Sequence, residues 1–574
     1  MSRVSVLKNS LRLVTGFCAL ILMLVPANAQ TVTGSLYGTI TDSTGAAIPR
    51  AQVTATNTGT NQVLRVESGA AGEYIFPVVN PGRYKVTIVM QGFETTTATD
   101  AQVDANRNVN VSFSLKPGAA TTEVSVSADT TLIDTRESQL GETIDQKRMV
   151  DLPLIGRNAY DLVQLVPGVT NYNAAPPIGD NGGTQFSVNG LRPNFNSFYL
   201  DGAYNTSFFR GGGNRAPAPD ALSQFRILTS NFDAEFGRYP GAVVNTITRS
   251  GTNQIHGVIY DYNRNAVFNA KGYFFGNGNV QKQVYNIFGA GVGGAIIKDK
   301  LFAFLSYQGT RLREATNIGS GGLIVPSDLE RTGDFSQPGT SNKPSLAVCP
   351  ALKCKTDAVT QAILQYVPRA DPGSTTTTSA GLLVFHPLGQ SKANPTNADQ
   401  GTARLDYQLT ASQKLQFTYF RSQGTGIDYT AGANNLLNYS GNRTSAGQSN
   451  YVIGHTWIIS PKVVNTLTGF YTLNKYVRTN VYSTAMLSDL GSAIKNGGPI
   501  TTQPQVRVTG FFSGGVGGSG PTTSAQLQAG LEDTANLSFH KNLLKFGGAV
   551  IFNRYAETAA FQSSTISTFN GNAA

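Results

Sequence analysis

Apolar and polar residues alternate along short segments through much of the chain after residue 252. In Lys414–Tyr419 the apolar side chains Leu415, Phe417 and Tyr419 occupy every second position. A period of two places successive side chains on opposite faces of a β-strand. The pattern therefore predicts strands with one apolar and one small or polar face. Two further sets share this spacing: Tyr451, Ile453, His455, Trp457 and Ile459, and then Leu544, Phe546, Val550 and Phe552.

A long series of such two-faced strands is typical of a transmembrane β-barrel. The signal is weak in any one segment, and a soluble β-solenoid or sandwich is the alternative interpretation of the same pattern. No stretch beyond the N-terminal segment reaches the roughly 18 consecutive apolar residues that a membrane-spanning helix requires. If the mature chain enters a membrane, it must therefore do so as a barrel.

The first 29 residues have the three parts of a secretory signal peptide. Three basic residues precede the apolar run Leu13–Val25, and the small residues at 27–29 predict cleavage between Ala29 and Gln30. We therefore expect the mature protein to be exported.

Residues 31–117 form a small all-β domain in this interpretation. Short alternating segments are separated by turns rich in Gly, Pro, Asn and Asp, which predicts a β-sandwich. The expected strands are Gly34–Ile40, Ala51–Thr56, Glu73–Phe76, Gly82–Val89 and Val109–Leu115. A linker rich in small residues follows at 118–131.

Residues 132–250 are a mixed region that we interpret as a plug domain, followed by a barrel at 251–574. A short helical pattern at Ala159–Val166 is ended by Pro167-Gly168. The stretch Asn231–Gly257 marks the seam between the two parts. It combines the β-branched run Gly241–Thr248 with the polar turn Arg249–Asn253.

Four charged residues flank this seam in a chain of which only 14% is charged. One hypothesis is that they form ion pairs between plug and barrel wall that break when the plug rearranges. The alternative is that they are solvated turn charges. The residues are Asp233, Glu235, Arg238 and Arg249.

The long segment Leu312–Gln400 lacks clear strands, as expected of an extracellular loop. It holds the two cysteines outside the signal segment, Cys349 and Cys354. In an exported chain this spacing predicts one small disulfide loop, with free thiols as the alternative.

The sequence lacks the motifs of a catalytic or metal-binding site. None of the four histidines falls in a zinc-protease motif or at a readable spacing from a nucleophile and a carboxylate. Gly289–Gly294 matches a dinucleotide-binding pattern, but no helix follows, so a Gly-rich strand is expected. Asp261–Asn265 begins like a calcium loop and lacks its essential Gly and Glu. We predict no enzyme activity, cofactor or metal site. The net charge of +10 is spread thinly, which does not indicate a nucleic-acid partner.

Three long segments resemble the plug of TonB-dependent outer-membrane receptors, above all the Oar-like group. They are LPLIGRNAYDLVQLVPGV from Leu152, FSVNGLRPNFNSFYLDGAYN from Phe186, and the segment from Pro219 through Gly257. In front of them, Gly38-x-Ile-x-Asp42 and the spacing that follows resemble the carboxypeptidase-regulatory-like domain. That module is transthyretin-like and is classed with carbohydrate-binding-like folds. The segments GDFS from Gly333 and HTWIISPKVVNTL from His455 also resemble Oar-like barrels.

The resemblance implies a mainly β protein with a transthyretin-like sandwich in the periplasm, an α+β plug and a barrel in the lipid of the Gram-negative outer membrane. A substrate, which could be a carbohydrate, a peptide or a metal chelate, would enter when the energy-transducing protein TonB moves the plug. The runner-up is a surface adhesion or secretion-associated protein without import activity.

One segment of the linker loosely resembles the TonB box through which such receptors engage TonB. An extended, alternating segment suits pairing with the edge of a partner's sheet. The alternative is a strand that merely enters the next domain. The segment consists of Glu123, Val124, Ser125, Val126, Ser127 and Ala128.

The expected barrel is incomplete. About nine or ten strand candidates follow the seam, whereas plugged transporters have about 22 strands. The sequence ends in polar residues instead of an aromatic closing strand. We therefore expect a truncated chain whose sheet has open edges.

Overall fold

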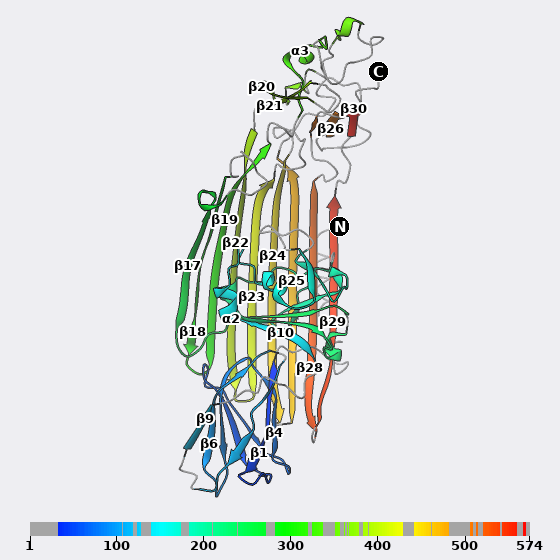
Figure 1. The fold of residues 1–574 in the computed structure, drawn as a ribbon. Helices are drawn as coiled ribbons and strands as arrows, with labels where there is room; N and C mark the ends of the chain where they lie inside the picture. Colours follow the sequence, from blue (N-terminus) through cyan, green and yellow to red (C-terminus); the bar gives the residue numbers. More distant parts are fainter. Residues whose placement is uncertain are drawn as a thin grey trace.

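The computed structural model shows three parts stacked along one axis (Figure 1). A sandwich lies at one end, a sheet of long strands packs against the plug in the middle, and extended connections project from the other end (Figure 1). The residues described are 33–105, 107–118, 123–127, 139–173, 183–208, 211–237, 239–270, 282–318, 324–336, 350–355, 361, 364–365, 367–377, 383–387, 390–428, 441–460, 462–481, 505–508, 512–514, 521–539, 542–559 and 566–569.

The sandwich consists of two sheets around one apolar core. One sheet contains β1 (Gly34–Asp42), β4 (Glu73–Val79), β7 (Asn108–Asn110) and β8 (Phe113–Leu115). The other has the order β3 (Val63–Glu67), β2 (Gln52–Asn57), β5 (Gly82–Val89), β6 (Thr95–Val103) and β9 (Glu123–Ser127). The core includes the buried side chains of Leu36, Ile40, Val53, Tyr84 and Ile88.

Gly38 of β1 shows why the sandwich motif needs a glycine there. A Cβ atom at this position would lie 2.0 Å from the carbonyl oxygen of Val111. The chain segments therefore approach too closely for any side chain. The five expected sandwich strands are present, with the last divided between β7 and β8, whereas β3 and the Thr-rich β6 were not anticipated.

The plug packs short helices against a five-stranded sheet. The sheet order is β10 (Leu140–Asp145), β15 (Leu222–Ser230), β16 (Val243–Thr248), β13 (Ser197–Leu200) and β14 (Ala203–Tyr204). A separate pair is formed by β11 (Val169–Asn173) and β12 (Gln185–Val188). The helical segments are α2 (Gln146–Asp151), η1 (Ala159–Leu165), η2 (Pro193–Phe195), η3 (Pro219–Ala221) and η4 (Ala234–Phe236).

The expected helical pattern in the plug is present as the 3-10 helix η1. Tyr160, Leu162 and Val163 are buried in the plug core with Phe186 and Phe225. The ring centroids of Tyr160 and Phe198 are 5.4 Å apart. Burial raises the pKa of the Tyr160 hydroxyl to about 12, so it is a neutral hydrogen-bonding group at physiological pH.

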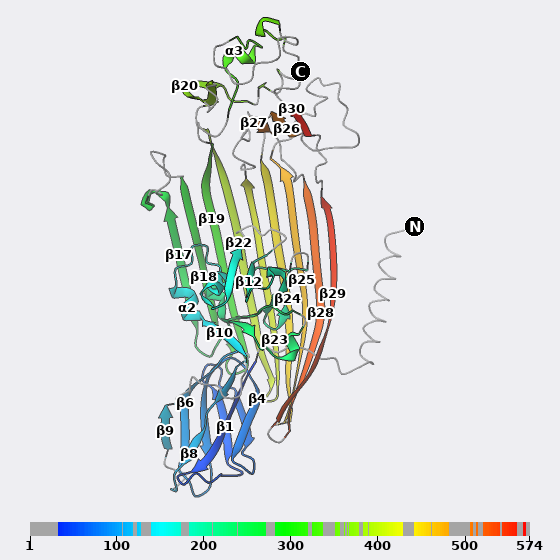
Figure 2. The ribbon, with the colours of Figure 1, turned by 45° about the vertical axis from the view of Figure 1, so that its right-hand side comes forward.

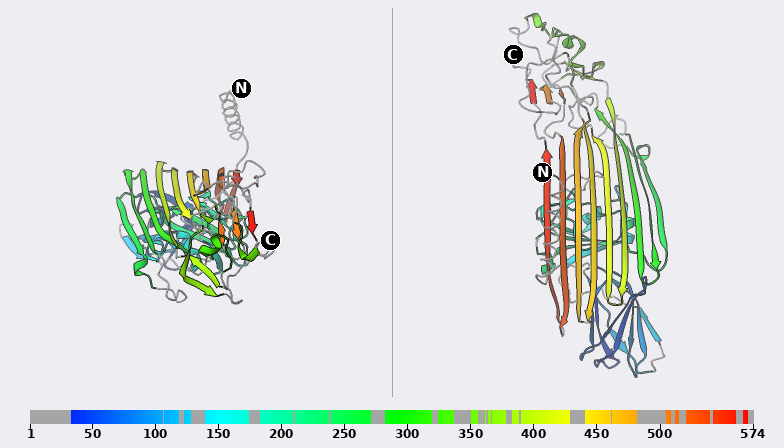
Figure 3. Two further views of the ribbon diagram at one scale, coloured as in Figure 1. Left: turned by 90° about the horizontal axis from the view of Figure 1, so that it is seen from above. Right: turned by 180° about the vertical axis from the view of Figure 1, so that it is seen from behind.

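The third part is an open antiparallel sheet of nine long strands. The order is β17 (His256–Asn265), β18 (Gln283–Ile297), β19 (Leu301–Ile318), β22 (Gln390–Thr410), β23 (Gln413–Asp428), β24 (Asn442–Ser460), β25 (Val463–Asn480), β28 (Thr522–Phe539) and β29 (Asn542–Ala559). Within the described residues β17 and β29 are its two edges. Figure 3 shows the sheet from behind, with the plug on its other face.

The sheet is apolar outside and polar inside. Phe417, Ile453 and Trp457 are 38%, 55% and 41% exposed on the face turned away from the plug. On the inward face Thr418, Gln528 and Thr534 are fully buried. This distribution is the transmembrane-barrel pattern predicted from the alternation. Gly289–Gly294 lies within β18 and Asp261–Asn265 within β17, as ordinary strand residues.

Short connections join the strands at the end that faces the sandwich, and long connections join them at the other end (Figure 2). The expected loop Leu312–Gln400 is shorter than predicted, because β19 continues to Ile318 and β22 begins at Gln390. The two strands pair throughout this extension, from Leu312 with Thr396 to Ile318 with Gln390.

The long connections contain several small elements. These are η5 (Ala266–Phe268), α3 (Asp328–Arg331), η7 (Pro350–Leu352), the hairpin of β20 (Ala370–Thr377) and β21 (Leu383–Pro387), and a small sheet of β26 (Gln505–Val508), β27 (Phe512–Gly514) and β30 (Ile566–Phe569). In the described part of the chain, no helix has the length and apolar character needed to cross a membrane.

Candidate functional site: the plug and barrel interface

A buried charged network joins the plug to the barrel wall near the sandwich end. At its centre is Arg404 of β22. Its Nε donates to Asp406 Oδ2 at 2.8 Å, and its Nη1 is 3.2 Å from Asp201 Oδ1 in the plug. The same Nη1 donates to the carbonyl oxygen of Thr248 at 2.9 Å. One guanidinium therefore bridges the wall, the plug turn and the end of plug strand β16.

Asp201 lies in the tight turn between β13 and β14, where its backbone has a positive φ of 49°. Both carboxylate oxygens are occupied. Oδ1 accepts from the Thr248 amide at 2.9 Å, and Oδ2 accepts from the hydroxyls of Thr248 at 2.6 Å and Thr418 at 2.8 Å. The side chain has no exposed surface. Its hydrogen bonds fix the turn against both β16 and the wall strand β23.

Asp406 completes the network on the wall side. Lys414 of β23 lies 2.9 Å from its Oδ1, and the Ser250 hydroxyl donates to its Oδ2 at 2.7 Å. Two cations thus face two carboxylates in a site largely closed to water. Buried charges cost several kcal/mol each in desolvation and are tolerated when paired and hydrogen-bonded in this way.

A second ion pair lies toward the other edge of the sheet. Lys545 Nζ of β29 is 2.7 Å from Glu235 Oε1 in η4. Apolar contacts surround this region, because Tyr199 and Phe236 of the plug pack in one cluster with Phe470 of β25. The plug is therefore held there by both charge and apolar packing.

Arg157 holds the plug at the opposite edge. Its guanidinium lies 4.7 Å from the ring centroid of Tyr260 and 4.4 Å from that of Tyr262, both on β17. It also pairs with Asp220 inside the plug, and both charged side chains are almost fully buried. An arginine stacked on two aromatic rings is favourable through cation–π attraction.

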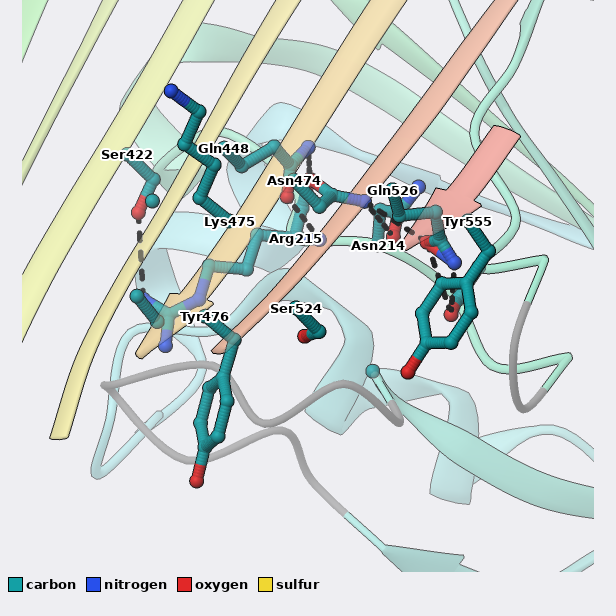
Figure 4. A pocket seen from close by; sticks show the side chains of 14 residues that line it. Asn214, Arg215, Ser422, Gln448, Asn474, Lys475, Tyr476, Ser524, Gln526 and Tyr555 are labelled. Atoms are coloured by element: carbon teal, nitrogen blue, oxygen red, sulfur yellow. Dashed lines mark hydrogen bonds between the residues drawn. The ribbon is translucent and has the colours of Figure 1, made fainter. Parts of the chain in front are cut away.

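Farther from the sandwich, the interface is built from uncharged amide groups. Arg215 donates its backbone N–H to Gln448 Oε1 at 2.9 Å. Asn450 of β24 donates to Asn205 at 2.9 Å, and Asn474 of β25 donates to Asn214 at 2.9 Å. Figure 4 shows Asn214, Arg215, Gln448 and Asn474 around a pocket between plug and wall.

Cavities lie along the interface between the described residues of plug and wall. The pocket in Figure 4 has a volume of about 50 Å³ and is lined by Asn214, Arg215, Gln448, Asn474, Gln526 and Tyr555 among others. A neighbouring cavity of about 300 Å³ shares Arg215 and Ser422 with it and is also lined by Arg157, Asp161 and Asp399. A third, of about 150 Å³, lies beside Arg404 and reaches the sandwich at Asn57 and Gln62. The contact between wall and plug is thus polar and partly hollow at these places, and apolar around Phe470.

The four charges predicted at the seam have different surroundings. Glu235 pairs with Lys545 of the wall, whereas Asp233 is exposed at the start of η4. Arg249 contacts the wall through an aromatic ring, with its guanidinium 5.4 Å from the Phe304 centroid. Burial lowers the pKa of Arg249, and the nearby Asp220 carboxylate acts in the opposite direction. Arg238 lies outside the described residues.

The other predicted residues are placed only in part. Glu123–Ser127 forms strand β9 on the sandwich, and Ala128 lies outside the described residues. Cys354 is disulfide-bonded, whereas Cys349 lies outside the described residues, so their pairing stays a prediction. The same holds for the cleavage site at Ala29 and Gln30. Among the described residues no group of three or more His, Cys, Asp or Glu could hold a metal ion.

Sequence reasoning missed the central network. Arg404 and Asp406 share one face of an alternating strand, and charges on the inner face of a barrel wall are a usable signal. Their partner Asp201 is 203 residues away from Arg404 in the sequence, so the contact itself has no local signature.

Comparison with known protein families agrees with this architecture. The model of an outer membrane beta barrel domain matches residues 247–574, the TonB-dependent receptor plug domain matches 137–243, and the carboxypeptidase regulatory-like domain matches 35–116. The chain belongs to the TonB-dependent outer-membrane receptors. The TonB-dependent transporter Oar of Myxococcus xanthus is 28% identical over 313 residues, which are 51% of this chain and 28% of that protein.

Two solved structures of such receptors are similar to this one. The outer membrane transporter YddB from Escherichia coli is 10% identical, covers 75% of this chain and 50% of its own, and gives a TM-score of 0.48. The siderophore receptor PirA from Acinetobacter baumannii is 16% identical, with 72% and 48% covered and a TM-score of 0.43. This chain therefore spans half or less of each of these relatives.

The family assignment fixes the location and orientation of the receptor. The barrel strands lie in the Gram-negative outer membrane, and the N-terminal sandwich lies on the periplasmic side. The short strand connections beside the sandwich are then periplasmic turns, and the long ones are extracellular loops. The family is one of receptors and transporters and is not an enzyme class.

Proposed function

We propose that this receptor takes up an extracellular substrate through rearrangement of its plug, driven by a TonB-type energy transducer in the periplasm. The observation that carries the proposal is the charged network of Asp201, Arg404, Asp406 and Lys414. It joins the plug to the wall near the sandwich end through ion pairs and hydrogen bonds, beside a cavity that Arg404 and Lys414 help to line. An interface of this kind can be released and re-formed, whereas a continuous apolar core would resist both steps.

The extracellular half of the same interface supplies the substrate contacts in this proposal. Its pockets are lined by amides, hydroxyls and tyrosines together with the charged side chains of Arg157, Asp161, Asp399 and Lys475, and Arg215 is common to both. Asn214 is buried, and its Nδ2 has no hydrogen-bond partner among the described residues. A free buried donor beside a pocket favours a ligand that presents hydroxyl or carbonyl oxygens, such as a carbohydrate or a peptide.

Energy coupling in this proposal passes through the candidate TonB box. The test uses cells that express the full-length receptor and are supplied with labelled oligosaccharides and labelled oligopeptides in parallel. We expect the receptor to accumulate one pool inside the cell, and deletion of residues 123–128 to leave binding at the surface but abolish accumulation. A deletion of equal length at 129–134 is the matched control.

A second arm dissipates the proton gradient of the inner membrane. It should reproduce the deletion phenotype in cells with the intact receptor. Accumulation that survives both treatments would contradict coupled import. Immunoblotting for the sandwich domain at the outer membrane excludes loss of the protein as the cause.

A further inference from the structure

The candidate TonB box does not hang free in this structure. Glu123–Ser127 folds back onto the sandwich as β9 and pairs in parallel with β6, from Thr95 with Glu123 to Thr99 with Ser127. The carboxypeptidase regulatory-like domain matches only residues 35–116, so β9 is an additional strand on that module. A segment between two domains has thus become the fifth strand of a sandwich sheet.

The backbone of β9 has one occupied and one open side. In a parallel pair, the N–H and C=O groups of one residue point to one neighbour, and those of the next residue point to the other side. Half of these groups therefore bond to β6, and within the described residues no strand pairs with the other half. An edge strand with a free row of donors and acceptors is a template for a strand of another chain.

We propose that the sandwich domain presents Glu123–Ser127 as an edge strand, and that a strand of the TonB-type transducer adds to its open side while β9 stays paired with β6. The sandwich is then part of the transducer's docking surface. This inference rests on the proposed function, since it concerns the same coupling segment.

Two observations favour the transducer as the occupant. The strand lies on the outer flank of the sandwich, at the end of the molecule away from the extracellular loops (Figure 2). The chain continues from β9 through residues 128–138 to β10, the edge strand of the plug sheet. A partner strand that pairs with β9 therefore lies in the periplasm. Through β9 it is connected to the plug by the short segment of residues 128–138.

A disulfide between β9 and β6 distinguishes two modes of binding. In one, the transducer adds to β9 while β9 stays on the sandwich; in the other, β9 must first leave β6. Thr99 and Ser127 are register partners, and Thr99 is exposed. The full-length receptor carrying Thr99→Cys and Ser127→Cys is purified in detergent, oxidised, and titrated with the periplasmic domain of the transducer. We expect its affinity to stay within about twofold of the reduced form and of the single-cysteine control Ser127→Cys.

A loss of tenfold or more on oxidation would overturn the proposal, because it would show that β9 must leave β6 before the partner binds. Stable dimers of the receptor alone that vanish when β9 is deleted would also overturn it, since a second copy would then occupy the edge. Binding that survives deletion of residues 123–128 contradicts the proposed coupling itself, which is a different outcome.

Proline substitution gives an independent measurement. Adjacent positions of β9 point their N–H groups to opposite sides, so Val124→Pro and Ser125→Pro should have different effects. We expect one variant to lose transducer binding while β9 remains protected from proteolysis. The other should expose β9 to protease. Equal behaviour of the two variants would contradict an edge-strand complex.

Discussion

Arg404 illustrates how a single side chain can hold two parts of a receptor together. Its guanidinium donates to Asp406, Asp201 and Thr248, and its planar shape allows these bonds in several directions at once. A lysine would present a single point charge at the same place. The network is therefore specific for arginine at this position.

Replacement of Arg404 by Ala should loosen the periplasmic half of the plug. Asp201 and Asp406 would then be left with less positive charge in a buried site, and breaking a buried pair in this way costs about 3–5 kcal/mol. Hydrogen exchange at the Thr248 amide, which donates to Asp201, measures the loss directly. The exchange rate should rise by at least a hundredfold in the variant.

Two further variants separate charge from packing in that experiment. Arg404→Lys retains the charge and should give an intermediate rate, because only part of the hydrogen bonding is lost. The double variant Asp201→Asn with Arg404→Gln removes the pair together and should exchange more slowly than Arg404→Ala. An exchange rate at Thr248 that is equal in all three variants would contradict the role of the network.

At this scale the sequence offered two interpretations of the seam charges: ion pairs between plug and wall, or solvated turn charges. Glu235 lies 2.7 Å from Lys545 of the wall, whereas Asp233 is exposed. The buried network was not anticipated, because a turn residue of the plug meets strands that follow it by some 200 residues. Such contacts arise from insertion of the plug beside the wall, and no local periodicity encodes them.

Among the elements, the position of β10 matters most for movement of the plug. It is the edge strand of the plug sheet and pairs with β15 alone within the described residues. It is also the first plug strand reached from the linker that contains β9. A pull on the linker therefore acts first on the pairing of β10 with β15.

Cross-linking of these two strands should prevent opening of the plug. Leu140 and Ser230 are register partners, and Leu140 is 60% exposed, so Leu140→Cys with Ser230→Cys disturbs no core packing. We expect the oxidised variant to bind substrate at the cell surface and to accumulate less than about a tenth of the wild-type amount. Reduction should restore accumulation. Full activity of the oxidised form would show that β10 stays paired during transport.

The two faces of a strand were predictable where one of them meets an apolar environment. Phe417 and Ile453 were placed on the outer face from alternation alone, and both are exposed there. The extension of β19 from Leu312 to Ile318 was missed, because its residues do not alternate. Above the lipid both faces of a strand meet water, so the period of two is no longer required. The Thr-rich β6 was missed for the same lack of an apolar signal.

On the scale of the whole molecule, the sandwich is docked against the periplasmic mouth. The turn between β18 and β19 provides Asp299, whose Oδ1 accepts from Asn61 of the sandwich at 3.0 Å and from Asn253 at 2.7 Å. The backbone N–H of Asn253 in turn donates to the Gly59 carbonyl oxygen at 2.9 Å. Inside the mouth, Arg226 of the plug donates to the Ala105 carbonyl at 3.2 Å. The sandwich therefore contacts both the wall and the plug.

The exposed contact between Asp299 of the wall and Asn61 of the sandwich should govern how often the sandwich separates from the barrel wall. Asp299→Gly removes the carboxylate without strain, because the residue has a positive φ of 63° that glycine adopts freely. The two lost hydrogen bonds are worth about 0.5–1.5 kcal/mol each, so exchange of the backbone N–H of Asn253 should accelerate by about 5- to 150-fold. Asp299→Asn keeps an oxygen acceptor and should stay near the wild-type rate. Exchange at Thr248, deep in the plug, should be the same in all three proteins. If it accelerated with Asn253, the sandwich and the plug would open as one unit, and docking of the sandwich would itself be part of the lock on the plug.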